Sequence, residues 1–329
     1  MSFLSPATTA EHEIRVATTG CADMTQLLGW LQRHFPVRVL PPERFREADF
    51  LICDTFNSVY ERYHGVRILV TVENHPADLD NFDYCLSHDK HEDDRRMYLP
   101  YWVLSSLFDA ERRRSLTEPR TPITADELRT QNRKFCAFVV RNPVCKRRNR
   151  LVKHLMPLRE VSCGGPLMNN IGYLVDDKTA FMAQHLFGVA YENCESPGYL
   201  TEKLPDALQA RCIPLYWGDE TVEDTFNPKA FLHARRFKDE AALIRYILEL
   251  SEDYGRMAAI LNEPPLLNPH ELDEAEARLL AFFTRIFECG PGAVRRTRLQ
   301  RIHAFVRHFY GHGLFRSIRT ISRRLRHKE

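Results

Sequence analysis

Four side chains that could bind an anionic sugar derivative lie close together between residues 191 and 218. They are Asn193, Tyr199, Glu202 and Lys203. The surrounding pattern predicts a strand ending at Tyr191, a turn at residues 196–198, and a helix capped by Thr201. Open α/β sheets bind ligands at the carboxyl ends of their strands, where a helix amino end and a lysine attract anions. The segment therefore predicts a sugar–phosphate site, with Glu202 accepting hydrogen bonds from sugar or ribose hydroxyls.

Two further residues with suitable chemistry lie earlier in the chain. Glu73 directly follows the apolar run 66–72, which predicts a strand, and its carboxylate could serve as a general base. Arg148 lies in a basic run at the start of a helix predicted over 147–158, where a guanidinium can hold a diphosphate through two hydrogen bonds. A solvated loop glutamate and a solvated basic face are the alternative interpretations. Arg147 is the alternative to Arg148.

Three motifs follow one another along the chain with regular spacing. They are ENHPADLDNFDYCLS from Glu73, FCAFVVRNP from Phe135, and YEN…GYLTEK…IPLYWG…FNP from Tyr191. In this order they resemble the α1,3/α1,4-fucosyltransferases of glycosyltransferase family 10, particularly the bacterial members. The resemblance implies an α/β fold of the GT-B type, in which two Rossmann-like domains face a cleft, and it implies GDP-fucose as the donor.

The resemblance also implies roles for the candidate residues. Glu73 takes the position of the catalytic base, and Arg148 and Lys203 take those of the cations that stabilise the departing GDP. Asn193, Tyr199 and Glu202 are expected to line the donor pocket. Whether Glu202 contacts the ribose or the fucose stays open.

Hydrophobic patterning divides the 329 residues into two α/β units and a tail. Residues 1–130 are predicted to form a Rossmann-like acceptor domain with a linker, and the stretch 109–132 to contain one short helix. Residues 131–290 form the predicted Rossmann-like GDP-fucose-binding domain, whose last helix, 271–287, can return to the first domain. Residues 291–329 are predicted to form a basic amphipathic tail.

The tail differs in charge from the rest of the chain. Its segment 294–329 carries eleven Lys/Arg and one acidic residue, although the net charge of the whole chain is only +2. Apolar residues at helical spacing are interleaved with these charges, which is typical of a helix on an anionic lipid surface. We expect residues 294–328 to make peripheral contact with the inner face of the cytoplasmic membrane, and the protein to be cytoplasmic. Packing on the acidic body is the alternative, and nucleic-acid binding is disfavoured because no reading motif accompanies the charge.

These features predict an inverting α1,3-(or α1,3/4-)fucosyltransferase. It would move L-fucose from GDP-β-L-fucose to the GlcNAc of an N-acetyllactosamine-type glycan, in the synthesis of a bacterial surface polysaccharide. No metal or other cofactor is expected to be required, because basic side chains and a helix amino end serve the diphosphate and the Asp78-x-Asp80 pair lies in a separate loop. A GT-B transferase for another nucleotide sugar, or a catalytically silent glycan- or nucleotide-binding protein, is the alternative.

Overall fold

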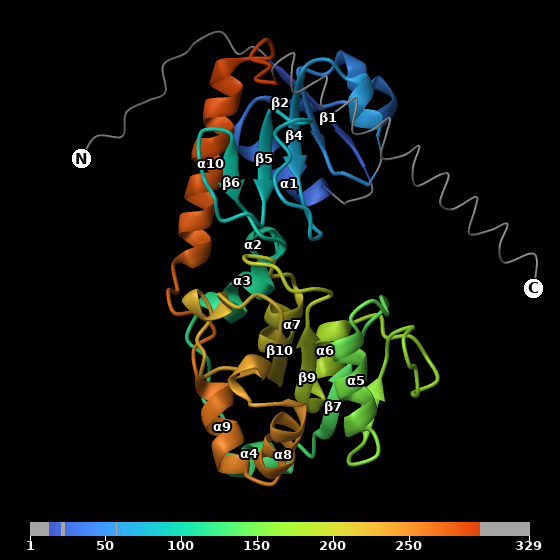
Figure 1. The fold of residues 1–329 in the computed structure, drawn as a ribbon. Helices are drawn as coiled ribbons and strands as arrows, with labels where there is room; N and C mark the ends of the chain where they lie inside the picture. The colour runs from blue at the N-terminus through green and yellow to red at the C-terminus, as the bar shows by residue number, and fades with distance from the viewer. Residues whose placement is uncertain (1–12, 21–23, 57, 297–329) are drawn as a thin grey trace, which may run out of the picture.

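Two parallel β-sheets, one above the other, form the framework of the chain (Figure 1). The computed structural model describes residues 13–20, 24–56 and 58–296. Every strand pair is parallel, and helices connect and cover the strands. The predicted α/β architecture with two Rossmann-like units is therefore confirmed.

The first sheet has six strands in the order β2-β1-β3-β4-β5-β6. Their bounds are β1 (Ile14–Thr19), β2 (Val37–Val39), β3 (Phe50–Cys53), β4 (Val66–Val70), β5 (Tyr84–Ser87) and β6 (Arg96–Tyr98). Helix α1 (Thr25–His34) and the short 3-10 helices η1 (Pro42–Glu47) and η2 (Val59–Arg62) accompany them. The central strands β3, β4 and β5 are mostly apolar and are buried throughout, as is typical of a parallel sheet covered on both faces, and the one charged residue in them, Arg67, is also buried.

The second sheet has five strands in the order β11-β10-β9-β7-β8. Their bounds are β7 (Lys134–Phe138), β8 (Val161–Cys163), β9 (His185–Tyr191), β10 (Ile213–Trp217) and β11 (Leu232–His233). The helices around them are α5 (Lys146–Leu155), α6 (Lys178–Ala183), α7 (Lys203–Gln209), α8 (Glu240–Ser251) and α9 (Tyr254–Asn262), with the 3-10 turns η3 (Val222–Asp224) and η4 (Ala234–Arg236).

Three helices connect the two sheets: α2 (Tyr101–Leu107), α3 (Ala110–Thr117) and α4 (Ala125–Thr130). The prediction of one short helix between 109 and 132 was wrong, because this stretch contains two. Asp109 caps α3 by accepting from the Arg112 N–H at 2.9 Å. Thr124 and Glu127 form a capping box that starts α4. These capping side chains were the sequence signals for the two helices.

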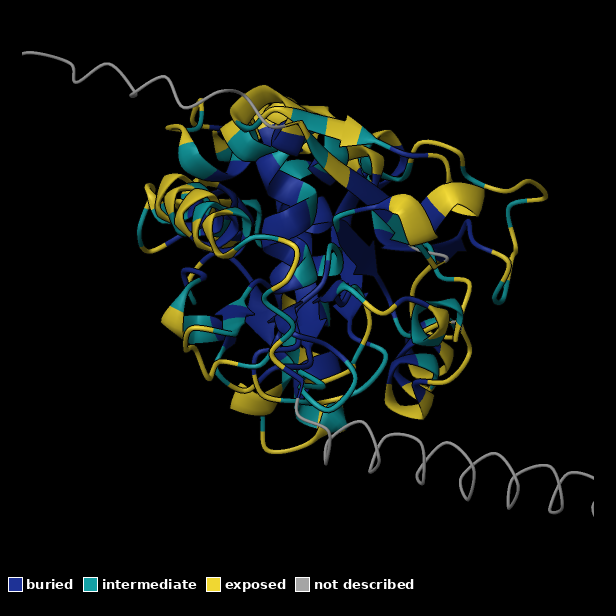
Figure 2. Ribbon diagram, turned by 90° about the horizontal axis from the view of Figure 1, so that it is seen from above, coloured by how far each residue is buried: buried dark blue, intermediate teal, exposed yellow. Residues whose placement is uncertain are grey.

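The last helix, α10 (Glu271–Cys289), runs back along the first sheet (Figure 1). The ring of Phe287 lies 5.0 Å from that of Phe50 on β3 and 5.0 Å from that of Phe35 after α1. Buried residues fill the interior of the molecule, and exposed residues lie at its surface (Figure 2). Because α10 returns, residues at the end of the described chain complete the core of the first sheet.

The predicted amphipathic tail falls mostly on residues 297–329, which lie outside the described residues. Its first part contacts the body: the Arg296 guanidinium is buried and lies 3.1 Å from the Asp83 carboxylate, and Arg295 N–H donates to the same carboxylate at 2.8 Å. Within the described ranges, no helix is long and apolar enough to cross a bilayer. The cysteines in these ranges are all unpaired.

Candidate active site

The carboxyl edges of the two sheets face each other and bring Glu73 and Tyr199 together. The Tyr199 hydroxyl, from the segment after β9, donates to Glu73 Oε2 at 3.1 Å. Next to it, Asn74 Nδ2 donates to Cys194 Sγ at 3.0 Å. Strand β4 ends at Val70 and not at residue 72 as predicted, so Glu73 lies in the loop beyond the strand and is exposed. The general base candidate therefore lies at the junction of the two units.

Tyr199 is buried in this junction. Its side chain is 2% exposed, and burial, followed by the nearby carboxylates of Glu192 and Glu73, raises its pKa, so the phenol stays a neutral hydrogen-bond donor. Gly198 precedes it with φ +76°, and a Cβ there would clash with the backbone oxygen of His88. Only glycine allows the two units to approach this closely while the chain adopts a left-handed turn.

Arg148 is fully buried and reaches across to the end of β9. Its Nη1 donates to the backbone oxygen of Tyr191 at 3.1 Å and to Asn193 Oδ1 at 3.0 Å, and its Nη2 donates to the backbone oxygen of Asn142. All three acceptors are neutral, and Nε has no hydrogen-bond partner among the described residues. A buried cation without a carboxylate partner favours an anion in its vicinity. By contrast, Arg147 is exposed and stacks over the Trp217 ring at 5.1 Å.

Lys203 stands at the start of α7 and is paired with a buried carboxylate. Its Nζ lies 3.1 Å from Glu192 Oε2, on a side chain that is 0% exposed, and 2.8 Å from Thr201 Oγ1. Burial lowers the pKa of Lys203, but the carboxylates of Glu192 and Glu202 outweigh that effect and raise it, so the ammonium stays charged. The prediction that Thr201 caps this helix was wrong. Its hydroxyl donates to Glu192 instead, at 2.7 Å, because a fully buried carboxylate requires several donors.

Glu202 and Asn193 flank these cations. Glu202 lies 3.5 Å from the Lys203 ammonium. Burial raises the pKa of Glu202, but the positive charges of Lys203 and Lys178 outweigh burial and lower the pKa to about 2. Asn193 orients the Arg148 guanidinium through its side-chain oxygen. All five predicted donor-side residues thus surround one region, where the carboxyl end of β9 meets the amino end of α7.

Two residues of this region were not predicted. Glu192 is the middle residue of the Tyr-Glu-Asn motif, and the signal for it was a carboxylate placed directly after an apolar strand. His88 follows β5, is 5% exposed, and packs edge-on against Tyr199 with ring centroids 5.4 Å apart. Its Nδ1 has no partner within the described part of the chain, and burial lowers its pKa. Nothing in the local sequence distinguished His88 from other loop histidines.

No group of three or more His, Cys, Asp or Glu residues that could hold a metal ion occurs in residues 13–20, 24–56 and 58–296. Asp78 accepts hydrogen bonds from the backbone of Asp80 and Asn81, at 3.1 and 3.3 Å, and so stabilises a turn. The residues described above instead present cations and neutral donors where the sheets meet.

Two parallel sheets with Rossmann-like topology, whose carboxyl edges face each other, are the architecture of the GT-B fold. The structure is similar to a crystal structure of an α1,3-fucosyltransferase with GDP-fucose, with a TM-score of 0.67 and 24% identity over 87% of this chain and 94% of that one. It is also similar to the same kind of enzyme with GDP, with a TM-score of 0.70. These similarities confirm the fold.

Residues 128–260 match the sequence model of the glycosyltransferase family 10 (fucosyltransferase) C-terminal domain. An α-(1,3)-fucosyltransferase of Helicobacter pylori is 30% identical over 255 residues, which cover 68% of this chain and 53% of that protein. A 3-galactosyl-N-acetylglucosaminide 4-α-L-fucosyltransferase of Bos taurus is 40% identical over 77 residues, or 22% of this chain and 21% of that protein. The chain therefore spans about half the length, or less, of these relatives. The resemblance to the fucosyltransferases is confirmed, and residues 128–260 are a family 10 C-terminal domain.

Proposed function

We propose that this protein is an inverting, GDP-fucose-dependent α1,3-(or α1,3/4-)fucosyltransferase acting on the GlcNAc of an N-acetyllactosamine-type glycan. The observation that carries the proposal is the buried Arg148, which has only neutral acceptors and lies beside Lys203 near the contact between Glu73 and Tyr199. Cations that stabilise the departing diphosphate and a carboxylate that accepts a proton are what transfer from a nucleotide diphosphate sugar requires. The activities of the similar proteins support the choice of fucose and of a GlcNAc acceptor.

In the proposed reaction, Glu73 accepts the proton of the acceptor hydroxyl as its oxygen bonds to the anomeric carbon of fucose. The bond from that carbon to the β-phosphate oxygen breaks, and its electron pair leaves with GDP. Attack from the face opposite the leaving group converts the β-linked donor into an α-linked product. The hydrogen bond from Tyr199 to Glu73 orients the carboxylate before the acceptor binds.

Arg148 and Lys203 stabilise the negative charge that develops on the departing diphosphate. Arg148 is already oriented by Tyr191 and Asn193, so little reorganisation accompanies donor binding. Lys203 is neutralised by Glu192 before the donor arrives, and it would share its donors between Glu192 and a phosphate oxygen. Glu202 would accept a hydrogen bond from a hydroxyl of GDP-fucose, because its lowered pKa keeps the carboxylate ionised.

The proposed setting is bacterial surface polysaccharide synthesis at the inner face of the cytoplasmic membrane, with the basic segment 294–328 as the membrane contact. The charge and apolar spacing of that segment support this assignment. No metal is proposed as a requirement.

The test is incubation of the purified protein with GDP-fucose and N-acetyllactosamine, without added metal, followed by mass spectrometry and NMR of the product. An α1,3-fucosylated trisaccharide would support donor, acceptor and inversion together. Release of GDP without a fucosylated product would exclude this acceptor and retain the donor. If folded protein gives neither signal, the proposal is replaced by one of the two alternatives. Turnover of another nucleotide sugar would indicate a GT-B transferase with a different donor, and GDP binding without turnover would indicate a silent binding protein.

A further inference from the structure

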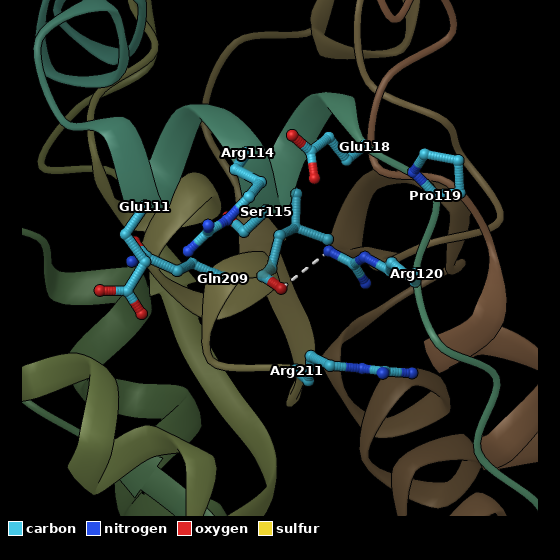
Figure 3. Close-up of a pocket in the computed structure, with 9 residues that line it drawn as sticks. Glu111, Arg114, Ser115, Glu118, Pro119, Arg120, Gln209 and Arg211 are labelled. Carbon is cyan, nitrogen blue, oxygen red and sulfur yellow. Dashed lines mark hydrogen bonds between the residues drawn. The ribbon is translucent and has the colours of Figure 1, made fainter.

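A second pocket lies away from the candidate active site, between the connecting helix α3 and the carboxyl end of α7 (Figure 3). Its cavity volume is about 290 Å³. That volume lies near the lower limit of small-molecule sites and suits a compact ligand. Helix α7 has Lys203 near its amino end and this pocket at its carboxyl end, so the two sites are separated by the length of the helix.

Three arginines line this pocket: Arg114 on α3, Arg120 in the connector, and Arg211 after α7. Arg120 and Arg211 are half-buried, whereas Arg114 is exposed. Figure 3 shows Arg120 and Arg211 on one side of the pocket and Arg114 on the other. The acidic lining residues, Glu111 and Glu118, are both exposed to solvent.

The positive charge of the half-buried pair is not neutralised by a carboxylate of the described chain. Arg120 donates to the backbone oxygen of Leu208 at 2.8 Å, and Arg211 donates to that of Thr121 at 2.6 Å. Burial and the repulsion from Arg211 lower the pKa of Arg120 to about 10. Burial likewise lowers the pKa of Arg211. The two cations therefore destabilise each other in the structure as it stands.

Capping of helix ends accounts for part of this arrangement. Leu208 and Leu261 lie at the carboxyl ends of α7 and α9, whose partial negative charges favour cations. Such capping explains the backbone contacts of Arg120 and Arg211. It explains neither the open cavity between them and α3 nor the third guanidinium, Arg114, which has no hydrogen bond or ion pair within the described ranges.

We propose that this pocket is a second binding site, which takes the phosphate group of a small molecule between Arg114, Arg120 and Arg211. A guanidinium presents a planar set of N–H donors that matches phosphate oxygens. A bound phosphate would separate two like charges and bridge the connector to the donor-side helix. The site is distinct from the proposed GDP site at the other end of α7.

The probe is inorganic phosphate, titrated against the full-length protein at constant ionic strength with chloride as the balancing anion. GDP is present throughout at saturation, so that the Arg148 and Lys203 region is occupied. The thermal unfolding midpoint is followed for the wild type, for Arg114→Glu, and for Arg245→Glu as the matched control. Arg114 and Arg245 are both exposed on helices, so both substitutions leave the buried structure intact.

Phosphate is expected to raise the unfolding midpoint saturably in the wild type and in Arg245→Glu. The apparent Kd for phosphate is expected to be about tenfold or more weaker in Arg114→Glu, because one charge-assisted contact is worth about that factor. An unchanged Kd in Arg114→Glu, an equal loss in both variants, or no difference between phosphate and chloride would each overturn the proposal. This test is independent of the proposed function, because a protein that does not turn over GDP-fucose can still show the Arg114-dependent response to phosphate.

Discussion

Replacement of Arg148 by lysine tests the central element of the proposed mechanism. The substitution keeps one positive charge but removes the guanidinium, which makes three hydrogen bonds to Tyr191, Asn193 and Asn142. A lysine ammonium is a point charge and cannot reproduce this planar set of donors. We expect kcat/KM for GDP-fucose to fall while the fold is retained.

The expected magnitude follows from the contacts. If Arg148 holds the diphosphate through two N–H donors, lysine retains one and loses the other. One hydrogen bond to a charged group is worth about 1.5–3 kcal/mol, which corresponds to a loss of roughly 10- to 150-fold in kcat/KM. Lost contacts to the three neutral oxygens will also lower the free energy of unfolding, which must be measured alongside.

The matched control is Arg147→Lys, one residue earlier on α5. Arg147 is exposed and only stacks over Trp217, so its replacement should change kcat/KM by no more than about threefold. Steady-state GDP release measures both variants, and urea unfolding shows whether they are folded. Equal losses in the two variants, or full activity in Arg148→Lys, would refute the assignment of Arg148 as the phosphate ligand.

Four further outcomes are expected. Glu73→Gln should lower kcat by about 10²–10⁴-fold with little change in the KM for GDP-fucose, because an amide cannot accept the proton; full activity would remove Glu73 as the base. Glu192→Gln should lower the free energy of unfolding in urea by about 3 kcal/mol, because it leaves Lys203 without its buried partner; an unchanged midpoint would show that the pair contributes nothing. Lys203 and Lys178 lower the pKa of Glu202 in the folded protein to about 2, against the opposing effect of burial. The ionised Glu202 therefore stabilises the folded protein at pH values above its unfolded pKa, and this contribution is lost as the pH falls towards 2. Between pH 5 and 3 the wild type should therefore lose more stability than Glu202→Gln, and parallel losses would contradict this coupling. Removal of divalent ions with EDTA should leave the initial rate unchanged, and a loss restored by one added metal would show that a metal is required.

Local patterns were sufficient to locate the two strands that lead to the site: β9 ends at Tyr191 as predicted, and β4 begins at Val66. The apolar run Ile213–Trp217, between a helix and Gly218, forms β10. The motif residues also occupy one region, since parallel strands place their carboxyl ends on the same edge of a sheet. Only one of the two helices within 109–132 was predicted, because neither helix has a pronounced apolar face of its own. Their stability comes from capping side chains and from packing on α7 and α9.

The sequence by itself determined the fold class, the family resemblance and the candidate residues, because these depend on residue types and on spacing along the chain. Only the tertiary structure decided their partners. Glu192 neutralises Lys203, Thr201 binds that carboxylate and caps no helix, and Tyr199 reaches Glu73 from 126 positions away in the chain. Such contacts depend on how closely the two sheets approach and on which groups burial deprives of water, and neither quantity is encoded in a local pattern.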